Sequence, residues 1–169
     1  MKRYVIATLM ALAAAPVAAH EPREVADGLY EIEVGWRTEP AIEDVLNNLD
    51  FFVVRADGTA VSVRDGDSLD VNFEVLYLAD DDFSAPVLAH RDLGSDLNQD
   101  FVNASRYNIP FIPTKNGAYG FRLTGTIEGH AVDETFVCGA GSQSIDEAFD
   151  CVTNAVTFPF GTWSRYIDN

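Results

Sequence analysis

Residues 30–36 read Tyr-Glu-Ile-Glu-Val-Gly-Trp, and the alternation of apolar and polar side chains in this stretch decides the fold class. Successive side chains of an extended chain point to opposite faces, so the stretch predicts a strand with one apolar and one solvated face. Residues 69–77 repeat the pattern, whereas 49–54 are apolar on both faces, which predicts a strand in the middle of a sheet. Shorter runs of the same kind occupy 107–112, 119–123, 132–136 and 156–158.

Turn signals separate these runs, with Asp-Gly, Asn-Gly and Glu-Gly pairs at 57–58, 65–66, 116–117 and 128–129. Only 41–49 and 144–149 suggest short helical turns. About seven short strands with regular turns predict an all-β domain, an immunoglobulin-like antiparallel β-sandwich. Tyr119 is the candidate for a tyrosine corner, in which the hydroxyl bonds back to upstream backbone. The alternative is an ordinary hairpin turn before an aromatic strand.

The least regular part of the chain runs from 80 to 105. It contains Asp80-Asp81-Asp82 and a polar stretch at 91–100. We expect a long acidic loop here that interrupts the sandwich. Long loops on rigid sandwiches are frequent binding sites, and an inert insertion is the alternative.

Residues 1–19 have the layout of a secretory signal peptide: two basic residues, an apolar run, and small residues that end at Ala19. Cleavage after Ala19 leaves one domain, residues 20–169, which begins with His20. Neither the apolar run nor any later segment reaches the ~18 apolar residues that suggest a membrane span. We therefore expect a periplasmic or secreted protein with no membrane insertion after cleavage.

The mature chain would be strongly acidic. Removal of Lys2 and Arg3 leaves 9 Lys and Arg residues against 27 Asp and Glu residues, a net charge of −18. Such a surface repels nucleic acid and anionic lipid, so neither is an expected partner. Solubility, or adaptation to a salty habitat, accounts for the acidity, and attraction of a cation or a basic partner is the alternative.

Two cysteines, Cys138 and Cys151, lie in this exported chain. An even pair in an oxidising compartment usually forms a disulfide, and we expect one here. The alternative is a pair of copper thiolates, but a separation of thirteen residues lacks the tight spacing of such sites.

Three histidines, His20, His90 and His130, are the candidate metal ligands. An N-terminal histidine offers both its α-amine and its imidazole to one ion, and copper(II) favours nitrogen donors. We therefore expect copper(II) at His20, with His130 or His90 as a helper if folding brings either one near. Histidines at turns are otherwise simply solvated.

Other chemistry has weaker support. Aspartates at 65, 67 and 70, or at 80–82, are numerous enough for a loose calcium cage, with a solvated acidic face as the alternative. Trp36, Trp163 and Tyr166 are candidates for a carbohydrate-stacking platform, although the phase of Trp36 in its strand predicts burial. No nucleophile elbow and no His-Glu-x-x-His sequence occurs, so we do not expect an enzyme.

Three stretches resemble known exported proteins: 30–40 (Tyr-Glu-Ile-Glu-Val-Gly-Trp-Arg-Thr-Glu-Pro), 48–53, and 112–136 with its Gly-x-Tyr-x-Phe and Val-Asp-Glu-x-Phe motifs. They resemble a group of exported bacterial and archaeal β-sandwich proteins of uncharacterised function. More loosely, they are similar to periplasmic immunoglobulin-like copper-handling proteins of the copper-resistance and YtkA-like kind. The resemblance implies copper held by an N-terminal histidine, a further histidine and an acid. Only His20 matches by position, and a mature chain without methionine excludes a thioether copper(I) site.

The sequence therefore predicts an exported binding protein that takes copper(II) through His20. The alternative is a structural or protein-interaction module of the cell envelope that holds no metal and presents its acidic loop at 80–100 to a protein partner.

Overall fold

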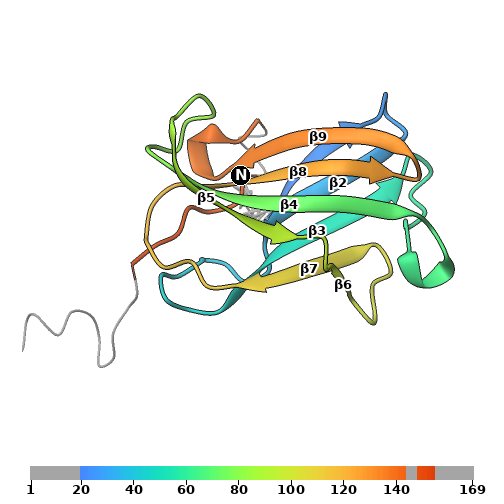
Figure 1. The fold of residues 1–169 in the computed structure, drawn as a ribbon, viewed down its shortest axis with the longest axis horizontal. Coiled ribbons are helices and arrows are strands. Elements are labelled where there is room, and N and C mark those ends of the chain that lie inside the picture. Colours follow the sequence, from blue (N-terminus) through green and yellow to red (C-terminus); the bar gives the residue numbers. More distant parts are fainter. Residues whose placement is uncertain (1–19, 144–147, 155–169) are drawn as a thin grey trace, which may run out of the picture.

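The computed structural model describes residues 20–143 and 148–154, which form two antiparallel sheets packed face to face (Figure 1). The first sheet has the strand order β1-β2-β3-β7-β6 and the second β5-β4-β8-β9. The strands are β1 (His20–Val25), β2 (Tyr30–Trp36), β3 (Asn47–Arg55), β4 (Leu69–Leu78), β5 (Val87–Gly94), β6 (Asn98–Gln99), β7 (Arg106–Phe111), β8 (Tyr119–Ile127) and β9 (His130–Val137). Two turns of 3₁₀ helix, η1 (Val63–Asp65) and η2 (Gly139–Gly141), complete the elements of the described residues. The prediction of an all-β antiparallel sandwich is confirmed.

An aromatic core fills the space between the two sheets. Trp36 of β2 is fully buried, and its ring lies 5.1 Å from that of Phe121 on the opposite sheet. Phe51 of β3 meets Phe73 of β4 across the same layer, with ring centroids 5.2 Å apart. These residues come from the alternating runs of the sequence, so the period-2 pattern gives the core face correctly. β3 lies in the middle of its sheet, as its two apolar faces predict.

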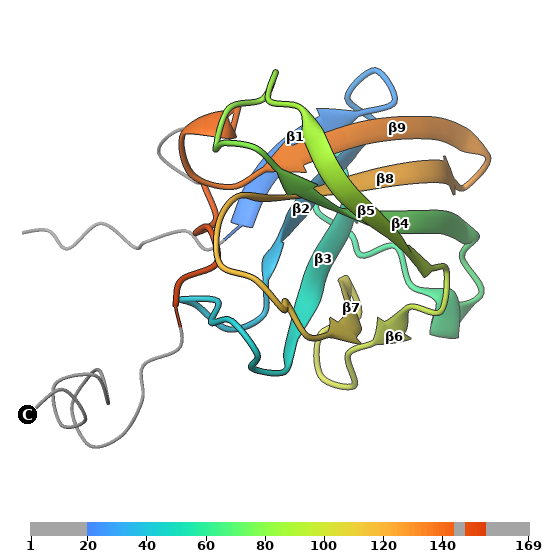
Figure 2. The ribbon, with the colours of Figure 1, turned by 60° about the vertical axis from the view of Figure 1, so that its left-hand side comes forward.

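One long side of the sandwich is closed by a charged cluster between β1 and β9, which lie together in Figure 2. The Arg23 guanidinium bonds to Glu21 at 2.6 Å and to Glu134 at 2.8 Å, and lies 4.2 Å from the centre of the Phe136 ring. Glu21 is fully buried, and one of its oxygens, Oε2, has no hydrogen-bond partner among residues 20–143 and 148–154. β1 thus turns Glu21 and Arg23 toward the interior, and only Val25 at its end adds an apolar side chain to the core.

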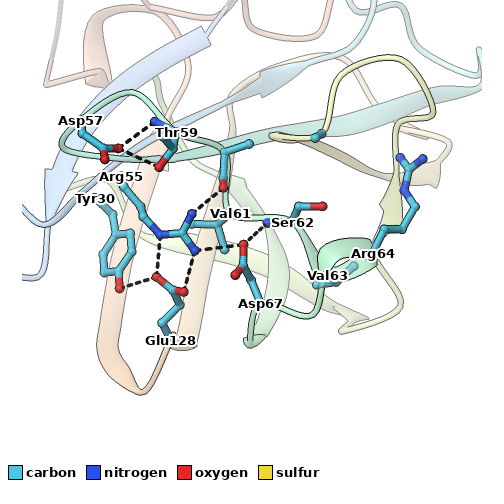
Figure 3. Close-up of polar contacts among 12 residues, drawn as sticks. Tyr30, Arg55, Asp57, Thr59, Val61, Ser62, Val63, Arg64, Asp67 and Glu128 are labelled. Carbon is cyan, nitrogen blue, oxygen red and sulfur yellow. Dashed lines mark hydrogen bonds and ion pairs between the residues drawn. The ribbon is translucent and has the colours of Figure 1, made fainter.

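A second polar network joins the sheets at the end where β8 turns into β9 (Figure 3). The Arg55 guanidinium donates to both carboxylate oxygens of Glu128, at 2.6 and 3.0 Å, and pairs with Asp67 at 2.9 Å. The Tyr30 hydroxyl donates to the same Glu128 carboxylate at 3.0 Å. These bonds, chiefly the one from Arg55, lower the pKa of Glu128. Asp67, which the calcium alternative uses as a ligand, is therefore already paired with a cation.

Two local contacts confirm predictions from the sequence. The Tyr119 hydroxyl donates to the backbone oxygen of Lys115 at 3.0 Å, which is the upstream contact expected of a tyrosine corner. Cys138 and Cys151 form a disulfide, with their Cα atoms 5.0 Å apart. The copper-thiolate alternative for these cysteines is therefore wrong. The disulfide fixes the segment after β9 beside the start of β8, where Cys138 Sγ also accepts from the Tyr119 amide.

The helical turn expected at 41–49 is absent, since 42–45 form a simple turn and β3 begins at Asn47. The Asn47 side chain explains the early start of the strand. It donates to the Thr38 oxygen at 2.8 Å and accepts from the Thr38 amide at 3.1 Å, which ties the two ends of this turn together. The second expected helical turn, at 144–149, lies largely outside the described residues.

The long acidic loop expected at 80–105 is not one loop. It contains β5, which pairs with β4, and β6, which pairs with β7. β5 is an edge strand whose first six residues are exposed, so it lacks the apolar alternation that marks buried strands. These two strands and β1 raise the number in the described residues to nine, against about seven predicted. The expected strand at 156–158 lies outside those residues.

None of the helical segments within 20–143 and 148–154 has the length and hydropathy of a membrane span.

Candidate functional site

The candidate site is built by four strands in register on the outer face of the first sheet. His20 of β1 pairs with Gly35 of β2, Gly35 pairs with Asp50 of β3, and Asp50 pairs with Asn108 of β7. Glycine has no side chain, so the His20 ring crosses over β2 without obstruction. Its Nε2 reaches the Asp50 carboxylate, two strands away, at 3.1 Å.

The Asp50 carboxylate is the centre of this cluster and is fully buried. Arg106 of β7 donates to it from Nε at 2.9 and 3.0 Å and from a terminal nitrogen at 2.5 Å. The Phe52 ring lies beneath both partners, 5.2 Å from the His20 ring at an edge-on angle of 87° and 5.1 Å from the Arg106 guanidinium. The His20 side chain retains 17% of its exposure, so it covers Asp50 and is itself partly open to solvent.

Electrostatics keep Asp50 ionised. Burial alone would raise its pKa, but hydrogen bonds from His20 and Arg106, together with their charges, outweigh burial and leave the pKa below its usual value. The hydrogen bond to Asp50 raises the pKa of Arg106 in turn. An ionised carboxylate only accepts hydrogen bonds, so the proton of the bond lies on His20 Nε2. In the neutral imidazole, Nδ1 then carries a free lone pair.

A second carboxylate, Glu39, lies within electrostatic range of His20. Burial raises the pKa of Glu39 to about 7, against a lowering hydrogen bond from the Asp150 amide at 2.9 Å and a smaller lowering effect of the His20 charge. A carboxyl with this pKa is partly protonated near neutral pH.

The two other histidines lie elsewhere, so the expected helper role of His130 or His90 is not supported by their positions. His130 begins β9 and packs against the Tyr30 ring at 5.8 Å; Tyr30 pairs with Val25, at the far end of β1 from His20. His90 lies on β5 of the other sheet and bonds to the Glu74 carboxylate. In the described part of the chain no group of three or more His, Cys, Asp or Glu side chains has a metal-binding arrangement.

Trp36 is not available for a carbohydrate-stacking platform, as its phase in β2 predicts. Trp36 is fully buried, and its Nε1 donates to the Asp150 backbone oxygen at 2.8 Å. It therefore has no face to offer to a sugar. Trp163 and Tyr166 lie outside the described residues.

Sequence reasoning missed the residues that surround His20. Asp50 and Arg106 carry a signal that was available, since an acid inside the apolar stretch 49–54 must find a cation when the strand is central. Gly35 interrupts the alternation of β2 at the position where the ring crosses. Which cation and which ring meet Asp50 depends on strand register, which the sequence pattern leaves open.

Comparisons of the chain with models of protein families, with curated proteins and with solved structures found no match in any of the three. The function of the site must therefore be inferred from its own geometry.

Proposed function

We propose that this protein is an exported, immunoglobulin-like binding protein of the periplasm or the extracellular space that holds copper(II) at its mature N-terminal residue, His20. It binds rather than catalyses. The observation that carries the proposal is the hydrogen bond from His20 Nε2 to the buried Asp50 carboxylate.

This bond selects the nitrogen that a chelate needs. A metal-ligating histidine usually donates its other ring N–H to a carboxylate, which fixes the tautomer and the orientation of the ring. With Nε2 held by Asp50, Nδ1 is the free donor, and Nδ1 is the ring nitrogen nearer the backbone and the α-amine of the same residue. Cleavage after Ala19 frees that amine. Two nitrogens of one residue then face the same ion.

Copper(II) takes tetragonal sets of nitrogen and oxygen donors, so oxygen ligands would complete the site beside the two nitrogens of His20. Glu39 interacts electrostatically with His20 and adds negative charge to the surroundings of a bound ion when it is ionised. Neither His90 nor His130 takes part in this arrangement. The proposed donors are thus the α-amine and Nδ1 of His20, with solvent in the remaining positions.

The test uses protein exported by its own leader. Intact-mass measurement fixes the first residue, and calorimetric titration with copper(II) then measures the dissociation constant. Asp50→Asn should weaken binding by about 10- to 100-fold, the usual effect of losing the partner that orients a ligand. One extra alanine before His20 should remove the high-affinity site altogether. His130→Ala is the matched control and should leave the affinity unchanged. Equal affinities of the native and the extended chain would contradict the proposal.

A second candidate is a protein-interaction module, and a different feature favours it. Phe101 and Val102, in the loop between β6 and β7, are 92% and 94% exposed. The loop is held in shape by Asp100, whose carboxylate accepts from the Val102 and Asn103 amides at 2.9 and 3.2 Å. A rigid loop that presents an aromatic ring loses little entropy on binding and suits a hot spot. The partner would be an envelope protein with an apolar pocket.

Site-specific photo-crosslinking in the living cell separates the two candidates. A photoreactive residue at Phe101 should give one discrete crosslinked product, and the product should disappear when Asp100→Ala loosens the loop. The same label at Leu88, an exposed apolar residue of β5, is the control and should give none. A crosslink that forms equally from both positions would refute the interaction site.

A further inference from the structure

A cleft lies beside β5 and the residues at the end of β7. It has a volume of about 190 Å³; Val75, Tyr77, Phe111 and Tyr119 supply apolar lining, and His90, Arg91 and Thr114 supply polar lining. An engineered apolar cavity of about 150 Å³ holds a benzene molecule, so this cleft has room for one phenyl ring.

Two cations without an ion-pair partner in the described residues flank the cleft. Arg91 lines it, and the Lys115 ammonium lies 5.6 Å from the centre of the Tyr77 ring, which also lines it. In a chain with 27 acidic residues and only 11 Lys and Arg residues, unpaired cations are unexpected. Their position beside a cleft with aromatic lining fits an occupant that carries both an aromatic ring and a carboxylate.

The described chain ends at the rim of this cleft. The Asn154 side chain bonds to that of Asn116, and the Asn116 backbone oxygen accepts from the Tyr77 hydroxyl at 3.1 Å. Residues 155–169 follow, a segment of 15 residues that can extend to roughly 50 Å. The segment contains aromatic residues and an acid: Phe158, Phe160, Trp163, Tyr166 and Asp168.

We propose that residues 155–169 dock in this cleft of their own chain, with the Phe158 ring in the cavity and the Asp168 carboxylate paired with Arg91. The segment supplies both groups that the cleft lacks, and it leaves the fold within four residues of the ring that fills the cavity. Docking also covers the exposed edge strand β5, where Val87 and Leu88 are 50% and 61% exposed. An uncovered edge with apolar side chains invites association with other chains, which this arrangement prevents.

The test compares tryptic cleavage after Arg165 in the full mature chain and in two variants. Ala89→Glu places bulk and a negative charge in the cleft lining, at an exposed position of β5. Ala131→Glu makes the same change at an exposed position of β9, the opposite edge of the same sheet, and is the matched control. Ala89→Glu should speed the release of residues 166–169 about tenfold or more, because cleavage follows the population of the undocked segment. Ala131→Glu should match the native chain.

A second readout does not depend on the protease. Acrylamide should quench the Trp163 contribution to emission, taken as the difference between the native chain and Trp163→Phe, more strongly in Ala89→Glu than in the native chain. Equal cleavage and equal quenching in native, Ala89→Glu and Ala131→Glu chains would overturn the proposal. Protection that disappears on dilution would also overturn it, since the segment would then occupy the cleft of a second copy.

Discussion

Replacing Asp50 by Asn tests the buried charge cluster on which the candidate site is built. The substitution preserves shape but removes the negative charge that three donating contacts from Arg106 and one from His20 share. Loss of one partner of a fully buried ion pair costs about 3–5 kcal/mol, because the other charge stays buried and unpaired. Arg106 is 27% exposed and can turn partly toward water. We therefore expect a loss of about 2–3 kcal/mol in the free energy of unfolding.

The chain supplies its own control for this experiment. Arg122 and Asp133 form an ion pair of the same type, with two hydrogen bonds at 2.9 and 3.0 Å, but their side chains are 46% and 60% exposed. Asp133→Asn should cost less than about 1 kcal/mol. Urea denaturation, with the slope m held common to all three proteins, measures both changes. If the two variants lose the same stability, burial does not set the strength of the Asp50 cluster and the reasoning is wrong.

Three further predictions concern other parts of the fold. Hydrogen bonds from the backbone of its loop lower the pKa of Asp100 from 3.8 to about 2. The stabilisation of the loop by the ionised carboxylate should therefore be complete above pH 3.8 and disappear as the pH falls to about 2, and a carboxyl NMR titration with an ordinary midpoint would contradict this. Gly125→Ala should cost at least about 2 kcal/mol, read by thermal unfolding, because φ is +136° and the new Cβ would lie 2.2 Å from the Asp70 backbone oxygen. Replacing Cys138 and Cys151 by serine should remove about 3 kcal/mol in the chain-entropy model for so short a loop, and an unchanged urea midpoint would count against it.

The parts of the fold that the sequence predicts are those where burial follows the period of the strand. β2, β3 and β8 turn apolar side chains to the core at alternate positions, and β4 does so from Val71 to Val75, so their alternation can be read from the sequence. β1 has the same geometry but turns Glu21 and Arg23 inward. These charges neutralise each other inside the sandwich. A search for alternating apolar residues therefore does not detect β1.

The candidate site was predictable only in part for a related reason. The position of His20 follows from the expected cleavage point, which is a local signal. The contact between His20 and Asp50 depends on the pairing of three strands. His130 is far from His20 because it packs on Tyr30, which pairs with the other end of β1. The register between strands that are distant in the sequence cannot be predicted from the residues of either strand alone. An aspartate in a central strand predicts a cationic partner, but the sequence does not identify which residue supplies the cation.

The position of the proposed donors within a single residue has a thermodynamic consequence. An amine and an imidazole on His20 belong to the unfolded chain as much as to the folded one, so both states can take up copper(II). A ligand stabilises a protein only by the difference between its affinities for the two states. That difference would come from Asp50, which meets the His20 ring only when β1, β2 and β3 are paired. Copper should therefore raise the melting temperature modestly even where it binds tightly, and chelation should leave the sandwich folded.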